Sequence, residues 1–92
     1  MTDIALTKTV KITNRRGLHA RASAKFVTMA SGVAADVRVA KDGPAVVGTS
    51  IMGLMMLGAA MGDSITISTS GNGAEAALDL LVGLVEDKFG EE

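Results

Sequence analysis

Hydrophobic and polar residues alternate along the first part of the chain. From Ile4 to Ile12 the even positions are Ile, Leu, Lys, Val and Ile, whereas the odd positions between them are Ala, Thr, Thr and Lys. Since successive side chains of a strand point to opposite faces, this pattern predicts a strand with one buried face. The alternation stops at "NRRG", and from about Ala20 to Ser31 apolar residues recur at helical spacing. We therefore expect a strand followed by a helix, with Gly32 just past the helix end.

Two more strands are predicted in the middle of the chain. Every second residue from Ala35 to Val39 is apolar, and the segment "KDGP" separates this run from "AVVGT". Two short apolar runs with Asp-Gly between them are typical of a β-hairpin. We therefore expect a tight turn at Asp42 and Gly43.

The remaining part of the chain predicts a short helix, a strand and a long helix. Ser50 can cap a helix that runs to about Met56 and is closed by Gly58. The segment 64–69 alternates again, with two isoleucines on its buried face. The last helix is expected over residues 74–89, where the apolar residues at helical spacing are Ala77, Leu78, Leu81, Val82, Val85 and Phe89.

The predicted elements define an α+β fold of order β-α-β-β-α-β-α. A chain of 92 residues is expected to form one domain, residues 1–92, and it shows no internal repeat. Each strand has one apolar face and each helix one apolar stripe, so the helices should cover one face of a four-stranded, mostly antiparallel sheet. Only Phe26 and Phe89 are aromatic, so the core must be mainly aliphatic.

Composition and charge argue against several classes of function. Nine basic and ten acidic residues give a net charge of −1 without a long basic run, and Trp and Tyr are absent, which disfavours nucleic-acid binding. One histidine and no cysteine cannot supply a zinc site, and no cofactor site is expected. The apolar segment 51–61 is too short to span a bilayer. The lack of cysteine and of a secretory pattern at residues 1–6 predicts a cytoplasmic protein.

The single histidine lies at a predicted strand-to-helix turn, in "NRRGLHARASAKF". Gly17 permits the turn, Leu18 can anchor it in the core, and His19 falls at the N-cap or first residue of the helix. The unpaired N–H groups and the positive end of the helix dipole form an anion site there, and Arg21 adds a guanidinium suited to phosphate or carboxylate. This environment favours a neutral imidazole, which is a nucleophile for a phosphoryl group.

These residues also allow other interpretations. An isolated histidine at a helix start is more often an exposed or capping residue, and neighbouring arginines such as Arg15 and Arg16 are more often solvated. The combination of Gly17, His19 and Arg21 at one turn favours a functional site. A Ser-His-Asp triad is not expected, because no nucleophile turn is recognisable. The Gly-rich segment 70–75 lacks the lysine of a phosphate loop and predicts only a turn.

Two segments of the chain resemble one known family. The segment "GLHARASAKFV", residues 17–27, resembles the active-centre segment of HPr, the histidine-containing phosphocarrier family of the bacterial phosphoenolpyruvate-dependent phosphotransferase system. The segment "GTSIMGLMMLGAAMGDSITI", residues 48–67, resembles the regulatory-serine segment of the same family. The chain length and the predicted element order also agree with this family, whose fold is an open-faced β-sandwich.

The resemblance implies a phosphoryl carrier rather than an enzyme. His19 would accept a phosphoryl group on Nδ1 from phospho-enzyme I, which phosphoenolpyruvate charges, and donate it to a histidine of an enzyme IIA. Arg21 would hold the phosphoryl oxygens, and Ser50 matches the serine that HPr kinase/phosphorylase modifies in many members. Many members have proline directly after the arginine, whereas this chain has Ala22, which keeps an additional N–H donor. The family serves carbohydrate uptake, with a nitrogen- or carbon-linked regulatory relay as the alternative, and we expect a monomer.

The methionine-rich segment after residue 50 predicts a partner-binding surface beside His19. A short helix cannot bury every side, and flexible methionines suit one carrier that serves several partners. Two alanines that match contact positions of the family would let a partner approach the first helix closely. The predicted partner-binding residues are Ala20, Ala24, Ile51, Met52 and Met55.

Two other functions are kept as alternatives. A regulatory binding module would act through phosphorylation of Ser50 and would not use His19. A phosphate on an N-cap serine adds about −1.5 to −2 charges, which would repel an apolar partner from the adjacent surface. A stand-alone hydrolase is disfavoured, because no second catalytic group can be identified near His19. The intact "GLHAR" segment favours the carrier.

Overall fold

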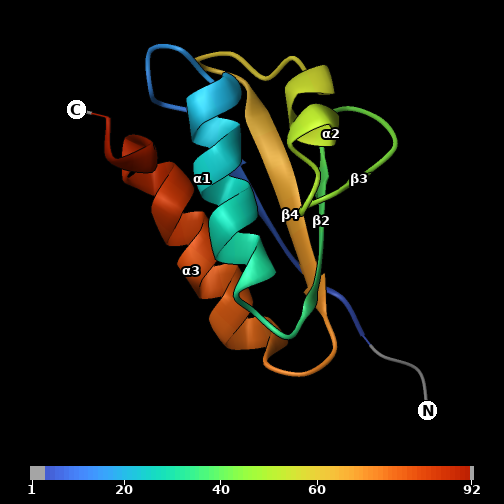
Figure 1. Cartoon of the computed structure of the whole chain (residues 1–92). Helices are drawn as coiled ribbons and strands as arrows, with labels where there is room; N and C mark the ends of the chain where they lie inside the picture. Colours follow the sequence, from blue (N-terminus) through green and yellow to red (C-terminus); the bar gives the residue numbers. More distant parts are fainter. Residues whose placement is uncertain (1–3, 92) are drawn as a thin grey trace.

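The computed structural model describes residues 4–91 and contains the predicted elements in the predicted order (Figure 1). The strands are β1 (Leu6–Lys11), β2 (Asp36–Ala40), β3 (Val46–Val47) and β4 (Ser64–Ser70). The helices are α1 (Ala20–Ser31), α2 (Ile51–Met56) and α3 (Ala74–Glu86), and a 3₁₀ turn, η1 (Lys88–Gly90), follows α3. Within residues 4–91, no helix has the length and apolar character needed to cross a membrane.

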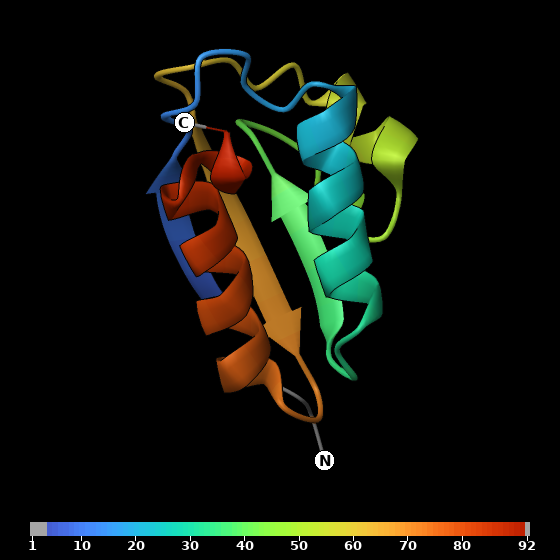
Figure 2. The same ribbon diagram turned by 60° about the vertical axis from the view of Figure 1, so that its left-hand side comes forward.

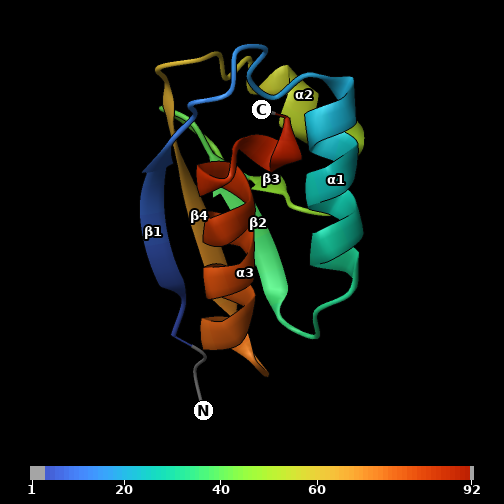
Figure 3. The same ribbon diagram turned by 90° about the vertical axis from the view of Figure 1, so that its left-hand side faces the viewer.

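The four strands form one sheet in the order β1-β4-β2-β3, and every pairing is antiparallel. The central strand β4 places Ile65 opposite Val10 of β1 and Ile67 opposite Val39 of β2. Helices α1 and α3 lie side by side over one face of the sheet, and α2 packs against α1 (Figures 2 and 3). The predicted open-faced sandwich is confirmed.

The core between the helices and the sheet is mainly aliphatic, as the composition predicts. Along β4 the residues alternate, with Ile65, Ile67 and Thr69 buried and the residues between them partly exposed. Phe26 of α1 and Phe89 after α3 are both fully buried. Because burial of one such side chain contributes about 1.5–3 kcal/mol, these two rings fix both helices against the sheet.

The first strand and the hairpin differ from the prediction. β1 begins at Leu6, and Ile4 precedes the first paired residue of this edge strand and is 81% exposed, so the predicted buried face holds only from Val10 onward. β3 has only two residues, and β2 and β3 are joined by a wide loop, residues 41–45, instead of a tight turn. Pro44 has no N–H to donate to a strand pairing, which explains why the pairing does not extend to the Asp-Gly pair.

The last helix ends three residues earlier than predicted. α3 ends at Glu86, and Lys88 and Phe89 have left-handed backbone angles, with φ of 56° and 55°. This turn allows the Phe89 ring to enter the core, where a straight continuation of the helix would not place it. The turn also brings Glu91 towards the start of α1.

Candidate functional site

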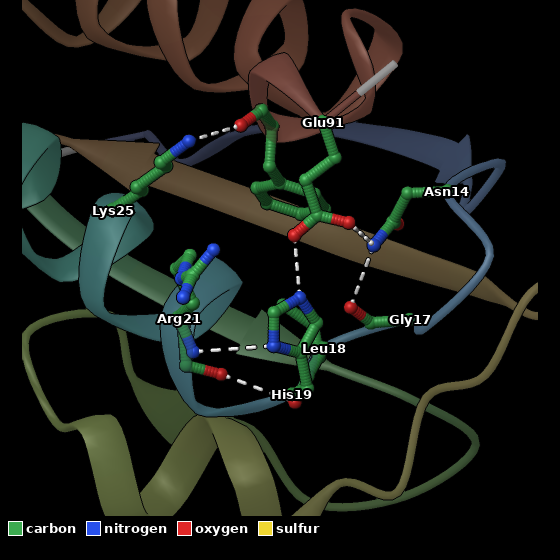
Figure 4. A network of polar contacts seen from close by, with 9 residues as sticks. Asn14, Gly17, Leu18, His19, Arg21, Lys25 and Glu91 are labelled. Carbon is green, nitrogen blue, oxygen red and sulfur yellow. Dashed lines mark hydrogen bonds and ion pairs between the residues drawn. The ribbon is translucent and has the colours of Figure 1, made fainter.

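His19 is the N-cap residue of α1, as the sequence predicts. Its backbone is extended, with φ −74° and ψ 179°, and its carbonyl accepts the first helical hydrogen bond from the Ser23 N–H at 2.9 Å. The ring Nδ1 accepts a hydrogen bond from the Arg21 N–H at 3.3 Å (Figure 4). The side chain is 22% exposed, so a reacting group can reach the ring while the backbone around it stays fixed.

Gly17 and Leu18 position this histidine on the protein. Gly17 has φ +65°, and a Cβ at this position would lie 2.4 Å from the carbonyl oxygen of Ala59. The Leu18 N–H donates to the same carbonyl at 2.9 Å, and the Leu18 side chain is buried. Only glycine fits this backbone conformation against another segment of backbone, so the turn fixes the start of α1 against the loop before β4.

The second ring nitrogen of His19 contacts Glu91, which comes from the other end of the chain. Nε2 and the Glu91 Oε2 are hydrogen-bonded, and the Glu91 Oε1 accepts from the Asn14 Nδ2 at 3.0 Å (Figure 4). The same Asn14 amide nitrogen donates to the Gly17 carbonyl at 2.8 Å. These contacts join the turn before α1, the imidazole and the C-terminal segment in one network.

The hydrogen bonds define which ring nitrogen is free to react. A carboxylate only accepts hydrogen bonds, so Nε2 carries the proton that it donates to Glu91. Nδ1 accepts from the Arg21 N–H and therefore has a lone pair. The arrangement holds the imidazole with Nδ1 as the nucleophilic atom.

The site is strongly cationic around one carboxylate. A polar pocket of about 370 Å³ is lined by Arg15, Arg16, His19, Arg21 and Glu91. Arg15 and Arg16, which taken singly would be expected on a solvated surface, therefore line the same pocket as the histidine. Three guanidinium groups and the N-terminus of α1 make this pocket suited to an anion.

Glu91 is ionised within this pocket. Partial burial raises the pKa of its carboxyl, but hydrogen bonds from His19 and Asn14 lower it by more. The net pKa lies below the ordinary value of 4.5. Sequence reasoning did not identify Glu91, because 72 residues separate it from His19 and the turn that brings it back interrupts an otherwise helical pattern.

Ser50 is the N-cap of α2 and lies outside the pocket around His19. Its Oγ accepts a hydrogen bond from the Gly53 N–H at 3.0 Å, and the residue is half-buried. Of the apolar residues on α2, Leu54 is fully buried in the core. Ile51, Met52 and Met55 are exposed on the surface of the helix.

The two alanines predicted as contact residues lie on α1. Ala20 is exposed and Ala24 is half-buried, and Ala24 lines an apolar groove of about 470 Å³ between α1 and α3. Arg21 lines both this groove and the polar pocket. Across residues 4–91, no three His, Cys, Asp or Glu side chains gather as ligands for a metal ion.

Comparison with known proteins places this chain in a family. A family model described as "PTS HPr component phosphorylation site" matches residues 6–87. The chain is 41% identical to the phosphocarrier protein HPr of Cupriavidus necator, over 94% of this chain and 97% of that protein. It is 40% identical to the phosphocarrier protein NPr of Shewanella violacea, over 94% of each chain.

The fold agrees with a solved structure of the same family. The crystal structure of HPr from Thermoanaerobacter tengcongensis superposes with a TM-score of 0.90 at 44% identity, and the match covers 95% of this chain and 98% of the other. The family model spans the site turn, both predicted segments and all of α3. The chain therefore belongs to the HPr family of phosphocarrier proteins of the phosphotransferase system.

Proposed function

We propose that His19 accepts a phosphoryl group on Nδ1 from phosphorylated enzyme I and passes it to a histidine of an enzyme IIA, in the cytoplasm and as a monomer. The protein then acts as a carrier that is modified transiently, and its partners catalyse the transfers. The observation that carries this proposal is the imidazole at the N-terminus of α1, whose Nδ1 lone pair lies beside Arg21 and whose Nε2–H donates a hydrogen bond to Glu91.

The chemistry follows from the groups around Nδ1. The Nδ1 lone pair attacks phosphorus while the bond from phosphorus to the donor atom of enzyme I breaks, and the electron pair of that bond returns to the donor atom. The Arg21 N–H, which now donates to Nδ1, becomes free to donate to a phosphoryl oxygen. Ala22 keeps an N–H in the first turn that a proline would lack, and the Arg21 guanidinium supplies a fixed positive charge. These donors are in place before the reaction, which is how transfer of a charged group is stabilised.

The exposed apolar residues support a docking surface for these partners. Ile51, Met52 and Met55 lie on α2, and Ala20 and Ala24 lie on α1, which packs against α2. We propose that partner proteins cover both helices when they approach His19. Substitution of Met52 by aspartate should weaken transfer from enzyme I and to enzyme IIA, with the fold unchanged.

The experiment that tests the carrier function is labelling with enzyme I and radioactive phosphoenolpyruvate. The wild-type protein should gain a phosphate that is labile in acid and stable in base, His19→Ala should gain none, and Arg21→Ala should be labelled more slowly. Ser50→Ala serves as the control and should be labelled like the wild type. Equal labelling of His19→Ala and the wild type would show that the acceptor is a different residue.

A regulatory role of Ser50 is the second candidate, and it rests on the N-cap contact of this residue. A phosphate there would stabilise the helix from its N-terminus and would place a charge of about −1.5 to −2 beside Ile51 and Met52. HPr kinase/phosphorylase is the enzyme class that would add it. Pull-downs with Ser50→Asp and the wild type should show different partner binding, and identical binding would remove this role.

The enzyme IIA that accepts the phosphoryl group distinguishes carbohydrate uptake from a regulatory relay. Relatives named HPr and NPr match this chain at 41% and 40% identity, so identity alone favours neither name. Phosphorylated protein should be offered in parallel to an enzyme IIA of a carbohydrate permease and to an enzyme IIA of a regulatory relay. The acceptor that is labelled at the higher rate identifies the pathway.

A further inference from the structure

The segment before Glu91 is fixed to the rest of the protein by a buried side chain and a hydrogen bond. Lys88, Phe89 and Gly90 all have left-handed backbone angles, a conformation that residues with a side chain rarely adopt. The Phe89 ring is fully buried, and its carbonyl accepts a hydrogen bond from the Lys25 Nζ of α1 at 2.7 Å (Figure 4). The unfavourable backbone is thus held by a core contact and by α1. As a result, the Glu91 carboxylate is directed at the His19 ring.

Asn14 supports the same arrangement from the opposite side. It is fully buried, and its amide nitrogen donates both to the Gly17 carbonyl and to Glu91. Its Oδ1 is buried without a hydrogen-bond partner within the described part of the chain. A buried acceptor without a partner is unfavourable for stability. The presence of an asparagine at position 14 is therefore explained by the two hydrogen bonds that its amide donates, and not by its packing in the core. Both of these bonds position the site.

We propose that Glu91 is a positioning residue for phosphoryl transfer, which holds the Nε2 proton of His19 throughout the reaction. This inference rests on the proposed carrier function. When Nδ1 bonds to phosphorus, the ring becomes cationic, and the carboxylate lies against the nitrogen that carries the proton. When the phosphoryl group leaves for the acceptor, the electron pair of the N–P bond returns to Nδ1. The proton stays on Nε2, so the leaving group is a neutral imidazole.

The surrounding charges support an anionic Glu91 across the working pH range. Arg15, Arg16 and Arg21 line the pocket with it, and guanidinium groups keep their charge in proteins. Lys25 lies close enough to lower the pKa of the carboxyl, after the larger effects of burial and of the hydrogen bonds from His19 and Asn14. Glu91 is therefore a carboxylate at neutral pH.

The test compares Glu91→Gln with Glu86→Gln. The first removes the charge next to Nε2 and keeps the shape of the side chain. The second removes the same charge from an exposed position in the last turn of α3. Ring ¹⁵N chemical shifts of the unphosphorylated proteins report which nitrogen carries the proton. The wild type and Glu86→Gln should show a protonated Nε2 and a Nδ1 with a lone pair, whereas Glu91→Gln should show a mixture of both tautomers.

The rate of phosphoryl transfer provides a second test of the role of Glu91. Transfer from phospho-His19 to enzyme IIA should be about threefold to tenfold slower in Glu91→Gln, a range that allows for the partial exposure of the pair. The pH dependence of phosphate loss from His19 should move to lower pH in this variant, because the protonated form is the labile one. A merely structural role would leave both the ring shifts and this pH profile as in Glu86→Gln.

The outcomes separate the two proposals. Labelled His19 with identical ring shifts, rates and pH profiles in all three proteins would overturn the role of Glu91 and leave the carrier function intact. A wild-type protein that enzyme I does not label at His19 would overturn the carrier function and this inference together.

Discussion

Replacement of Gly17 by alanine tests the turn that positions His19. The residue has φ +65°, and a new Cβ would lie 2.4 Å from the Ala59 carbonyl oxygen and 2.8 Å from the Ala60 Cα. Two effects add up. The left-handed backbone is unfavourable for any residue with a Cβ, and the neighbouring atoms belong to backbone, which cannot rotate away as a side chain would.

The size of the effect follows from these contacts. The left-handed conformation costs about 1–2 kcal/mol. To reach ordinary contact, the segment at Ala59 must move away by about 1 Å, which weakens the 2.9 Å hydrogen bond from the Leu18 N–H and costs about 1 kcal/mol more. Gly17→Ala should therefore lose about 2–3 kcal/mol, out of the roughly 5–14 kcal/mol expected for a chain of 92 residues.

Urea unfolding at equilibrium measures this loss, and Gly58→Ala is the matched control. Gly58 has φ +66°, but a Cβ there would have no atom within 4 Å. The control should lose only the backbone contribution of about 1–2 kcal/mol. Equal losses in the two variants would refute the argument that close approach to Ala59 requires glycine at position 17. Slower labelling of folded Gly17→Ala by enzyme I is also expected, because His19 would shift with the turn.

Three further predictions each concern the hydrogen bonds of one side chain. Asn14→Asp replaces a donor 3.0 Å from the Glu91 carboxylate with a second carboxylate. Urea unfolding at pH 7 should show a loss of about 1–3 kcal/mol, and this loss should be smaller at pH 4, where carboxyls begin to protonate. A backbone N–H and then the Lys41 ammonium lower the pKa of Asp63 below 3.8, so its stabilising effect is present above pH 3.8 and is lost as the pH falls through its lower folded value. Asp63→Asn should therefore reduce the fall in thermal midpoint between pH 6 and pH 2, and an unchanged fall would contradict the assignment. Ser50→Ala removes the side-chain cap of α2 and should lower the unfolding free energy by about 1 kcal/mol, whereas Ser50→Asp should keep most of it, as urea unfolding can check.

Local patterns in the sequence were sufficient for most of the fold. The order of strands and helices, the limits of α1 and the buried face of β4 follow from periodicity and from residues such as Gly32 and Ser50, which act over a few positions. The same holds for the centre of the site. Gly17, His19 and Arg21 are neighbours in the sequence, and the chemistry of a helix N-terminus links them without reference to any distant residue.

The tertiary structure decided the features that depend on distant contacts. Phe89 fits the helical spacing of α3, yet the ring reaches the core only because the chain turns into a left-handed conformation, and no local signal predicts that turn. The turn places Glu91 against the imidazole, 72 residues from His19 in sequence, and Asn14 donates a hydrogen bond to the same carboxylate. The sequence alone therefore predicted the candidate nucleophile and its anion site. The sequence alone does not show that Nδ1 has the lone pair or that Glu91 accepts the hydrogen bond from Nε2. The packing of α3 against the sheet decides both, because only that packing brings the two ends of the chain together.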